Sequence, residues 1–147
     1  MANIFDAFTL AGRALSVQRA RLDVASSNLA NAQTTRTEQG GPYRRRDVVL
    51  RETREPGSFE AVLRGEADRV RSVEVDHVRE DAAPPRLVFE PDHPDADSNG
   101  FVAYPNINTV EEMVNMITSM RSYQANLNVL SGLRTLAERA LTIGRNF

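Results

Sequence analysis

The placement of proline is the feature that most limits what this chain can fold into. All seven prolines lie between Pro42 and Pro105, and none lies nearer to either end. A proline inside a helix removes a backbone hydrogen bond and clashes with the preceding turn, so long helices are open only to the two ends. Charge divides the chain in the same way, because residues 34–108 hold 11 of the 18 Arg and 15 of the 20 Asp and Glu. We therefore predict a mainly α fold with a small β insert, in which 1–33 and 109–147 form a discontinuous helical core and 34–108 a β-rich region with irregular loops.

The N-terminal segment carries a regular apolar spacing. From Ile4 to Ala32, its apolar residues are alternately four and three positions apart, which is the heptad pattern of a coiled coil. We call this set of residues the seam of the helix, and Gln18 is its one polar member. The segment is predicted to be a helix whose alanine-rich seam allows another helix to approach closely.

The C-terminal segment repeats this pattern. Thr109 and Glu112 fit a capping box, in which the two side chains satisfy backbone N–H groups at the start of a helix. From Met113 to Leu127 the alternating spacing returns, again with one glutamine, Gln124, and beyond Leu127 the apolar face widens. A second long helix is therefore predicted to begin at Thr109.

The two predicted helices, 4–32 and 109–144, are expected to pair antiparallel within one chain and to form a coiled-coil core. The insert leaves the first helix near residue 33 and enters the second near residue 109, and this register places Gln18 opposite Gln124. A polar pair in an apolar seam can fix the register of two helices. The same register places Ile4 near Glu138 and leaves the residues beyond without a partner in the chain. We expect three of them to pack against a neighbouring subunit: Leu141, Ile143 and Phe147.

The outer faces of both predicted helices carry small uncharged side chains, chiefly Ser and Asn. A solitary coiled coil usually carries Glu, Lys and Arg there, so these faces favour packing against protein on several sides. The alternative is a helix that simply carries few charges. Between the helices, four runs of strand length are rich in β-branched or aromatic residues and are bounded by Gly and Pro. These predicted strands are 43–50, 72–78, 86–89 and 101–104.

Residues that carry catalytic chemistry are scarce. The chain has no cysteine and two histidines, and it contains no nucleophile elbow, phosphate-binding loop or dinucleotide fingerprint. Residues 95–100 fit the opening of a calcium-binding loop, but Asn106 stands where glutamate is required and Pro94 where a helix is required. We interpret this segment as a turn rich in Asp and Asn. No enzymatic activity, bound metal or cofactor is predicted.

Composition excludes two further classes of partner. A net charge of −2 argues against a dedicated nucleic-acid binder, which needs a basic face. No apolar run approaches the roughly 20 residues of a membrane-spanning helix, so direct membrane insertion is not expected. The first residues do not resemble a cleaved secretory signal, and export from the cytoplasm would need another route.

Three stretches of the chain resemble one known family. Residues 22–32 are similar to the N-terminal signature of bacterial flagellar rod and hook proteins, and residues 109–126 are similar to the C-terminal region of the same family. Residues 93–108 resemble a segment typical of one proximal-rod member. The resemblance covers both ends of the chain, whereas the stretch from Arg51 to Arg86 matches no known pattern.

The resemblance implies a structural subunit of the flagellar basal-body rod, which spans the periplasm and transmits torque from the motor to the hook. It implies export by the flagellar type III apparatus without a cleaved signal. The implied partners are other proximal and distal rod proteins, the adapter that joins the rod to the MS ring, and further copies of the chain. Two alternatives stay open: another rod or hook subunit of this family, and a non-flagellar helical adaptor or chaperone.

Three sets of residues are candidates for assembly contacts. In the N-terminal helix they are Ile4, Phe8, Ala11, Leu15, Gln18, Leu22, Ala25, Ser27, Asn28, Leu29 and Asn31. In the C-terminal helix they are Met113, Ile117, Met120, Tyr123, Gln124, Leu127, Leu130, Leu141, Ile143 and Phe147. In the loop that resembles the proximal-rod member they are His93, Pro94, Asp95, Asp97, Asn99, Gly100, Tyr104, Pro105 and Asn106.

Overall fold

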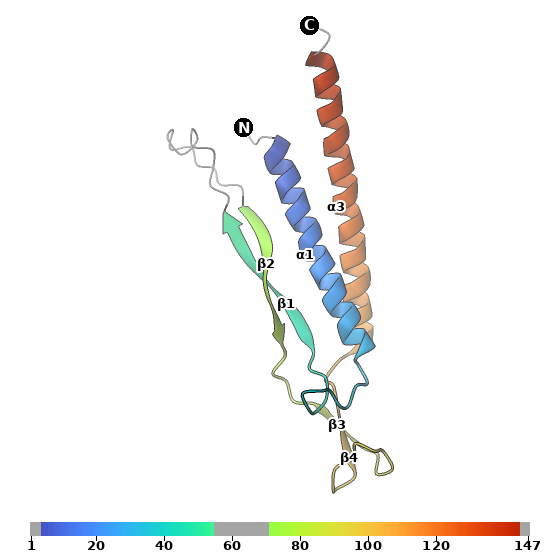
Figure 1. The fold of residues 1–147 in the computed structure, drawn as a ribbon. Helices are drawn as coiled ribbons and strands as arrows, with labels where there is room; N and C mark the ends of the chain where they lie inside the picture. Colours follow the sequence, from blue (N-terminus) through green and yellow to red (C-terminus); the bar gives the residue numbers. More distant parts are fainter. Residues whose placement is uncertain (1–3, 55–70, 145–147) are drawn as a thin grey trace. The chain divides into compact units, whose positions relative to one another are not determined.

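The computed structural model describes residues 4–54 and 71–144 and contains two long helices separated by short strands. The elements are α1 (Ile4–Ala30), β1 (Arg46–Arg54), β2 (Arg71–Glu80), β3 (Arg86–Phe89), β4 (Phe101–Tyr104) and α3 (Thr109–Gly144) (Figure 1). The predicted long N- and C-terminal helices and the small antiparallel β insert are confirmed, whereas the predicted coiled-coil core stays a prediction. The strands predicted at 86–89 and 101–104 match β3 and β4, and the other two are found with shifted ends. Neither helix, over its described residues, is long and apolar enough to cross a membrane.

The chain divides into two compact units. The first contains Met1–Arg19, Leu50–Asp76 and Met120–Phe147, and the second contains Ala20–Val49 and His77–Ser119. Each long helix contributes one part to each unit. The predicted division into a helical core and a β-rich insert therefore stays a prediction.

In the first unit, ion pairs hold the paired strands together. Arg51 of β1 pairs with Glu74 and lies 3.8 Å from Asp76 of β2. Arg13 of α1 donates a hydrogen bond of 2.9 Å to the Thr53 hydroxyl. The side chains of the two ion pairs are 33–61% exposed, so the contribution of these pairs to stability is small.

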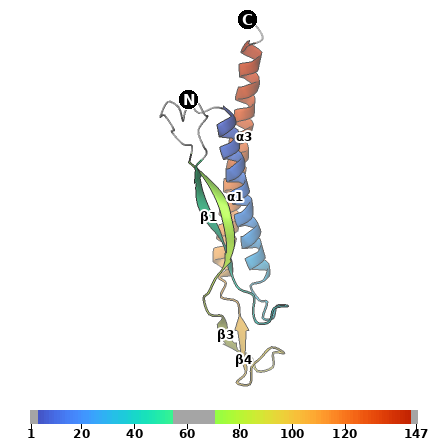
Figure 2. The same ribbon diagram turned by 60° about the vertical axis from the view of Figure 1, so that its left-hand side comes forward.

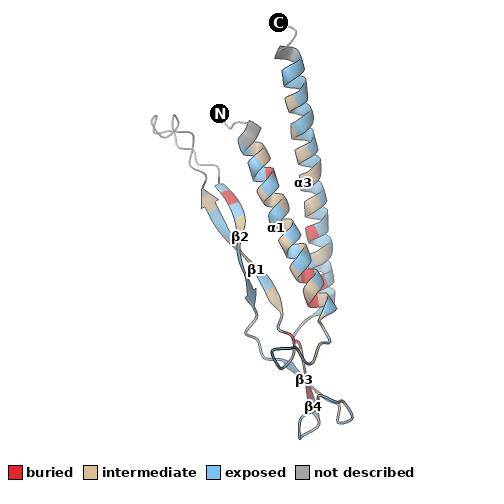
Figure 3. Ribbon diagram, viewed as in Figure 1, coloured by how far each residue is buried: buried red, intermediate tan, exposed pale blue. Residues whose placement is uncertain are grey.

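The second unit contains most of the buried residues of the described chain (Figure 3). The last turns of α1 lie beside the first turns of α3 and run in the opposite direction, as Figures 1 and 2 show from two sides. Strand β3 pairs antiparallel with β4, with Val88 opposite Val102 and Phe89 opposite Phe101. Val102 is fully buried, whereas the two phenylalanine rings meet edge to face on the outer side of the hairpin, their centroids 5.3 Å apart.

The less exposed face of α3 lies one residue away from the predicted seam. Glu112 and Ser119 are buried, and Met116 and Tyr123 are half-buried. Over residues 112–124 the predicted seam was wrong, because the hydrogen bonds of Glu112 to Asn28 and Arg45 turn its face inward, and spacing alone does not decide this. The predicted members lie one position later and are exposed: Met113, Ile117, Met120 and Gln124.

The two seam glutamines do not form the predicted polar layer. Gln124 is exposed, and its amide donates to Asn128 of the same helix at 3.4 Å. No hydrogen bond joins it to Gln18 in the part of the chain that the structure describes. Rotation of α3 away from the predicted seam is the physical reason, since it turns Gln124 outward.

The predicted capping box at the start of α3 is also wrong. The Asn108 side-chain oxygen accepts hydrogen bonds from the N–H groups of Val110 at 3.1 Å and Glu111 at 3.4 Å, which makes Asn108 the N-cap. Thr109 is exposed, and the carboxylate of Glu112 is used elsewhere. The capping box does not form because the carboxylate of Glu112 binds Asn28 and Arg45, which lie far away in the sequence.

Candidate functional site

A buried asparagine joins three segments of the second unit. The Asn28 side chain, near the end of α1, is fully buried. Its amide nitrogen donates to the Arg46 carbonyl at 2.8 Å and to Glu112 Oε2 at 3.1 Å. Its oxygen accepts from the Arg46 N–H at 2.9 Å and from the Tyr43 hydroxyl at 3.2 Å. Both donors and both lone pairs of the amide are thereby used, so burial leaves no polar atom of this side chain unsatisfied.

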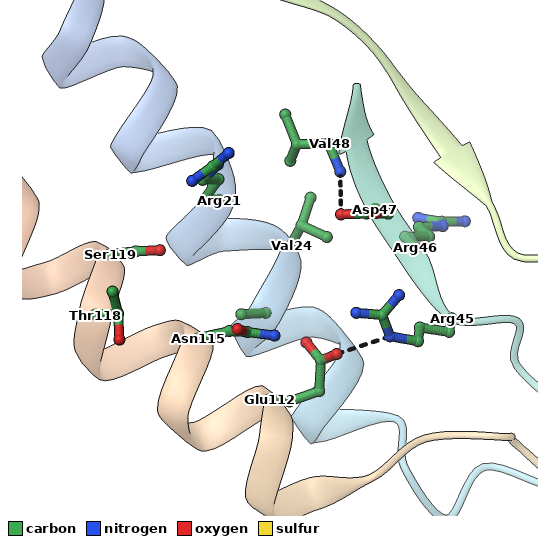
Figure 4. Close-up of a pocket in the computed structure, with 11 residues that line it drawn as sticks. Arg21, Val24, Arg45, Arg46, Asp47, Val48, Glu112, Asn115, Thr118 and Ser119 are labelled. Atoms are coloured by element: carbon green, nitrogen blue, oxygen red, sulfur yellow. Dashed lines mark hydrogen bonds and ion pairs between the residues drawn. The ribbon is translucent and has the colours of Figure 1, made fainter. Parts of the chain in front are cut away.

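Glu112 provides the ionic part of this arrangement. Its Oε1 accepts a hydrogen bond of 2.8 Å from Arg45 Nε (Figure 4), and its side chain is 3% exposed. Burial lowers the pKa of Arg45, but the hydrogen bond and the charge of Glu112 outweigh burial, with smaller contributions from Asp47 and Glu111. The pKa of this guanidinium therefore lies above its ordinary value. A buried carboxylate that is both paired and hydrogen-bonded escapes most of the cost of its desolvation.

Ser27 and Tyr43 complete what we call the polar node, defined as Ser27, Asn28, Tyr43, Arg45, Arg46 and Glu112. Because the Tyr43 hydroxyl donates its proton to Asn28, the Ser27 hydroxyl, 3.2 Å away, must donate to Tyr43. The Arg46 guanidinium lies over the Tyr43 ring, 5.5 Å from its centroid, which adds a cation–π contact. The node therefore fixes the end of α1, the start of β1 and the start of α3 in one arrangement.

Asn31 ends helix α1 next to the polar node. Its amide donates to the Ser27 carbonyl at 2.9 Å, and its oxygen accepts from the Thr34 hydroxyl at 3.2 Å. Three polar residues of the N-terminal signature thus have structural partners: Ser27, Asn28 and Asn31. The partners of Ser27 and Asn28 were not predicted, because Tyr43, Arg46 and Glu112 lie 15 to 84 positions away in the sequence. The three consecutive arginines at residues 44–46 were the available signal.

The loop at residues 93–100 is held by its own side chains. Asp97 Oδ1 accepts hydrogen bonds from the N–H groups of Asn99 at 2.8 Å and Phe101 at 2.9 Å. Asp95 Oδ2 accepts from the Thr35 hydroxyl at 2.8 Å, which fastens the loop to the segment that follows α1. His93 Nδ1 accepts from the Asp95 N–H at 3.1 Å. These carboxylates thus serve turn formation, as the interpretation of an Asp- and Asn-rich turn requires.

Tyr104 contacts one further candidate of this loop, His93, and also Glu90. The Tyr104 hydroxyl donates to Glu90 at 2.9 Å, and its ring meets His93 edge to face with centroids 6.2 Å apart. Pro105 is buried, whereas Pro94, Asn99 and Asn106 are exposed. The pKa of Tyr104 is raised mainly by its hydrogen bond to Glu90, then by burial and by the Glu90 charge, while the Arg86 charge lowers it.

Glu90→Gln is expected to lower the pKa of Tyr104 toward the ordinary value of about 10. The raised pKa means that the neutral phenol contributes stability below about pH 10, and this contribution is lost as the pH rises through the folded-state value. Tyrosine ring shifts in an NMR titration measure the change. Glu111→Gln, which removes a carboxylate that does not contact Tyr104, should leave that pKa unchanged. An unaltered pKa in Glu90→Gln would contradict the assignment.

The apolar assembly candidates fall into two groups. On α1 two of them are buried, Ala11 and Ala25. The others on this helix are half-buried, and so is Gln18: Phe8, Leu15, Leu22 and Leu29. On α3 Tyr123, Leu127 and Leu130 are half-buried, while Met113, Ile117, Met120 and Leu141 are exposed. Phe147 and the side chains of Ile4 and Ile143 lie outside what the structure describes.

Comparisons with known proteins agree along nearly the whole chain. Residues 8–36 match the family model described as "Flagella basal body rod protein", and residues 98–143 match "Flagellar basal body rod FlgEFG protein C-terminal". The flagellar basal-body rod protein FlgC of Salmonella typhimurium is 43% identical over 143 residues, which are 97% of each chain. FlgC of Bacillus subtilis is 38% identical over 149 residues, covering 96% of this chain and 98% of the relative. FlgC of Borreliella burgdorferi is 36% identical over 153 residues, covering 95% and 97%. The chain therefore belongs to the FlgC family of flagellar basal-body rod proteins.

Proposed function

We propose that this chain is a structural subunit of the proximal part of the flagellar rod and carries torque between the motor and the hook. The observation that carries the proposal is the match to curated FlgC proteins over almost the full length of both chains. The polar node suits this role because it fixes three segments through directional hydrogen bonds. The function is mechanical and involves no catalysis.

The exposed apolar residues of α3 are the surface that this role requires. Val110, Met113, Val114 and Ile117 occupy positions i, i+3, i+4 and i+7 on one face of the helix, and all are at least 40% exposed. A side chain of this kind gains roughly 1.5–3 kcal/mol when it is fully buried, so contact with neighbouring helices would be favoured. We place the coiled-coil core in the assembled rod, where this face and Leu141 meet other subunits.

The proposed partners follow from the position of this chain in the proximal part of the rod. They are other proximal and distal rod proteins, the adapter at the MS ring, and further copies of the chain. The flagellar type III apparatus would deliver the subunit to the growing rod across the periplasm. An adaptor or chaperone outside the flagellum is the competing function, and it would leave the protein free of the basal body.

Electron microscopy of labelled basal bodies tests the proposal. An epitope placed in the exposed loop at residues 82–85 marks the chain at residues that form no hydrogen bond with the polar node. In a motile strain whose own gene for this subunit is replaced by the tagged chain, gold-labelled antibody is expected on the rod next to the MS ring. The untagged chain is the control for nonspecific label. Swimming cells whose purified basal bodies carry no label would contradict the proposal and favour an adaptor.

A further inference from the structure

A polar pocket opens beside the polar node. It has a volume of about 270 Å³ and lies entirely within the second unit. Residues from α1, from β1 with the residue before it, and from α3 form its walls (Figure 4). Three residues of the polar node also line this pocket: Arg45, Arg46 and Glu112.

Besides Glu112, the wall formed by α3 contains three polar side chains that have no hydrogen-bond partner among the described residues. Asn115, Thr118 and Ser119 share one face of the helix and line the pocket. None of the three side chains forms a hydrogen bond with another described residue. Ser119 is only 6% exposed, so its hydroxyl is directed into the pocket instead of into open solvent. A wall of this composition accepts a polar group, because an apolar occupant would leave three side chains desolvated and unpaired.

The opposite wall is positively charged. Arg21 of α1 lines the pocket and has no ion pair among the described residues. Arg45 donates its Nε to Glu112, and the terminal nitrogens of its guanidinium lie on the pocket side (Figure 4).

The two carboxylates of the wall do not neutralise these arginines fully. Both oxygens of Glu112 are already engaged, by Arg45 and by Asn28. Asp47 is exposed, and its Oδ1 accepts the N–H of Val48 at 2.9 Å. Arg46 also lines the pocket, and its guanidinium lies 3.4 Å from Glu80. The guanidinium of Arg21 is therefore left to bind an anion that comes from outside the chain.

We propose that this pocket receives the carboxylate of an Asp or Glu side chain from an adjoining rod subunit. The occupant forms a charge-assisted pair with Arg21 and accepts hydrogen bonds from the hydroxyls of Thr118 and Ser119 and the amide of Asn115. The volume suits one short acidic side chain. This inference rests on the proposed function, because it takes the neighbour to be a subunit of the rod.

A carboxylate built into the pocket tests its chemistry in the isolated protein. Ser119→Asp is expected to give a carboxyl group whose pKa lies below the ordinary value of about 3.9, because Arg21 stabilises the charged form. Adding Arg21→Ala should raise that pKa again. The measurement is an NMR titration of the side-chain carboxyl carbon.

Thr118→Asp, at the exposed edge of the same pocket, replaces Ser119→Asp in this test if Ser119→Asp does not fold. Ser131→Asp, on an exposed part of α3 outside the pocket, is the matched control and should not respond to Arg21→Ala. A raised pKa in the pocket variants would overturn the proposal.

Charge reversal tests the docking itself in cells. Arg21→Glu is expected to abolish swimming although circular dichroism shows a folded protein, because the two carboxylates repel. Arg79→Glu, at an exposed arginine of β2 that has no partner in the described chain, is the matched control and should swim. Substitution of an acidic residue by Lys or Arg in a neighbouring rod protein, or in a second copy of this chain, should restore swimming to Arg21→Glu.

The outcomes separate this inference from the proposed function. Normal rods and normal swimming with Arg21→Glu would overturn the pocket and leave the rod assignment intact. Absence of the tagged wild-type chain from basal bodies would overturn the rod assignment, whatever Arg21→Glu does. Titration of the isolated protein with acetate and with inorganic phosphate distinguishes a docking pocket from a site for a free anion. Weak binding of both supports docking, whereas tight binding of phosphate overturns it.

Discussion

Asn28→Ala is expected to lower the free energy of unfolding by about 3–5 kcal/mol, since four buried or half-buried groups lose a partner at once. They are the N–H and carbonyl of Arg46, the Tyr43 hydroxyl and Glu112 Oε2. The methyl group of alanine replaces none of these bonds. The loss of one partner from a buried carboxylate adds to the effect, because Arg45 alone then holds Glu112.

Urea unfolding of the purified chain, followed by circular dichroism, measures this effect. Amide exchange at Arg46 should accelerate in the variant, because its N–H donates to Asn28 in the wild type. Asn31→Ala is the matched control at the end of the same helix. Asn31 is half-buried and its side chain forms two hydrogen bonds, so the expected loss is about 1 kcal/mol. Equal effects of the two substitutions would show that the node is not the main polar anchor.

Gly100→Ala is expected to destabilise the hairpin of β3 and β4 by about 2–4 kcal/mol. Gly100 has a φ of +81°, which L residues rarely adopt, and an added Cβ would lie 2.9 Å from a ring carbon of Phe89. The Cβ of Pro91 would be 3.3 Å away on the same side. Backbone strain and overpacking therefore act together, and the Phe89 ring has to leave its contact with Phe101.

Gly41→Ala separates the two causes. Gly41 has a φ of +74°, but no atom lies within 4 Å of the position of its Cβ. Only backbone strain should then remain, with a loss of about 1 kcal/mol. Thermal unfolding measures both variants, and nuclear Overhauser contacts between the rings of Phe89 and Phe101 report on the hairpin. Equal losses at the two glycines would show that the packing against Phe89 contributes nothing.

The positions of the helices and of the hairpin could be predicted from the sequence because local signals decide them. Absence of proline and a sustained apolar period gave α1 and α3 to within two residues at their ends. Gly and Pro turns bounded β3 and β4 correctly. Each of these features depends on residues that are close together in the chain, so neighbouring side chains suffice to indicate it.

The rotation of α3 and the partners of Asn28 depend on distant residues and could not be predicted. Asn28 and Glu112 are 84 positions apart, and no local pattern connects them. The same long-range bond explains the wrong capping box, since Glu112 gains more from Arg45 and Asn28 than from an exposed N–H. The pocket beside the node was missed for a related reason. Its polar wall at Asn115, Thr118 and Ser119 has the composition of an ordinary solvated face.

The buried amide of Asn28 has a consequence for how a loaded subunit yields. Apolar contacts let helices slide by small steps, because one methyl group can replace another with little loss. An amide with four partners in fixed directions permits no such step, since a rotation that breaks one bond also misaligns the other three. We therefore expect the end of α1 to resist twisting until all four hydrogen bonds of Asn28 break together, and to return to the same angle when the load is removed.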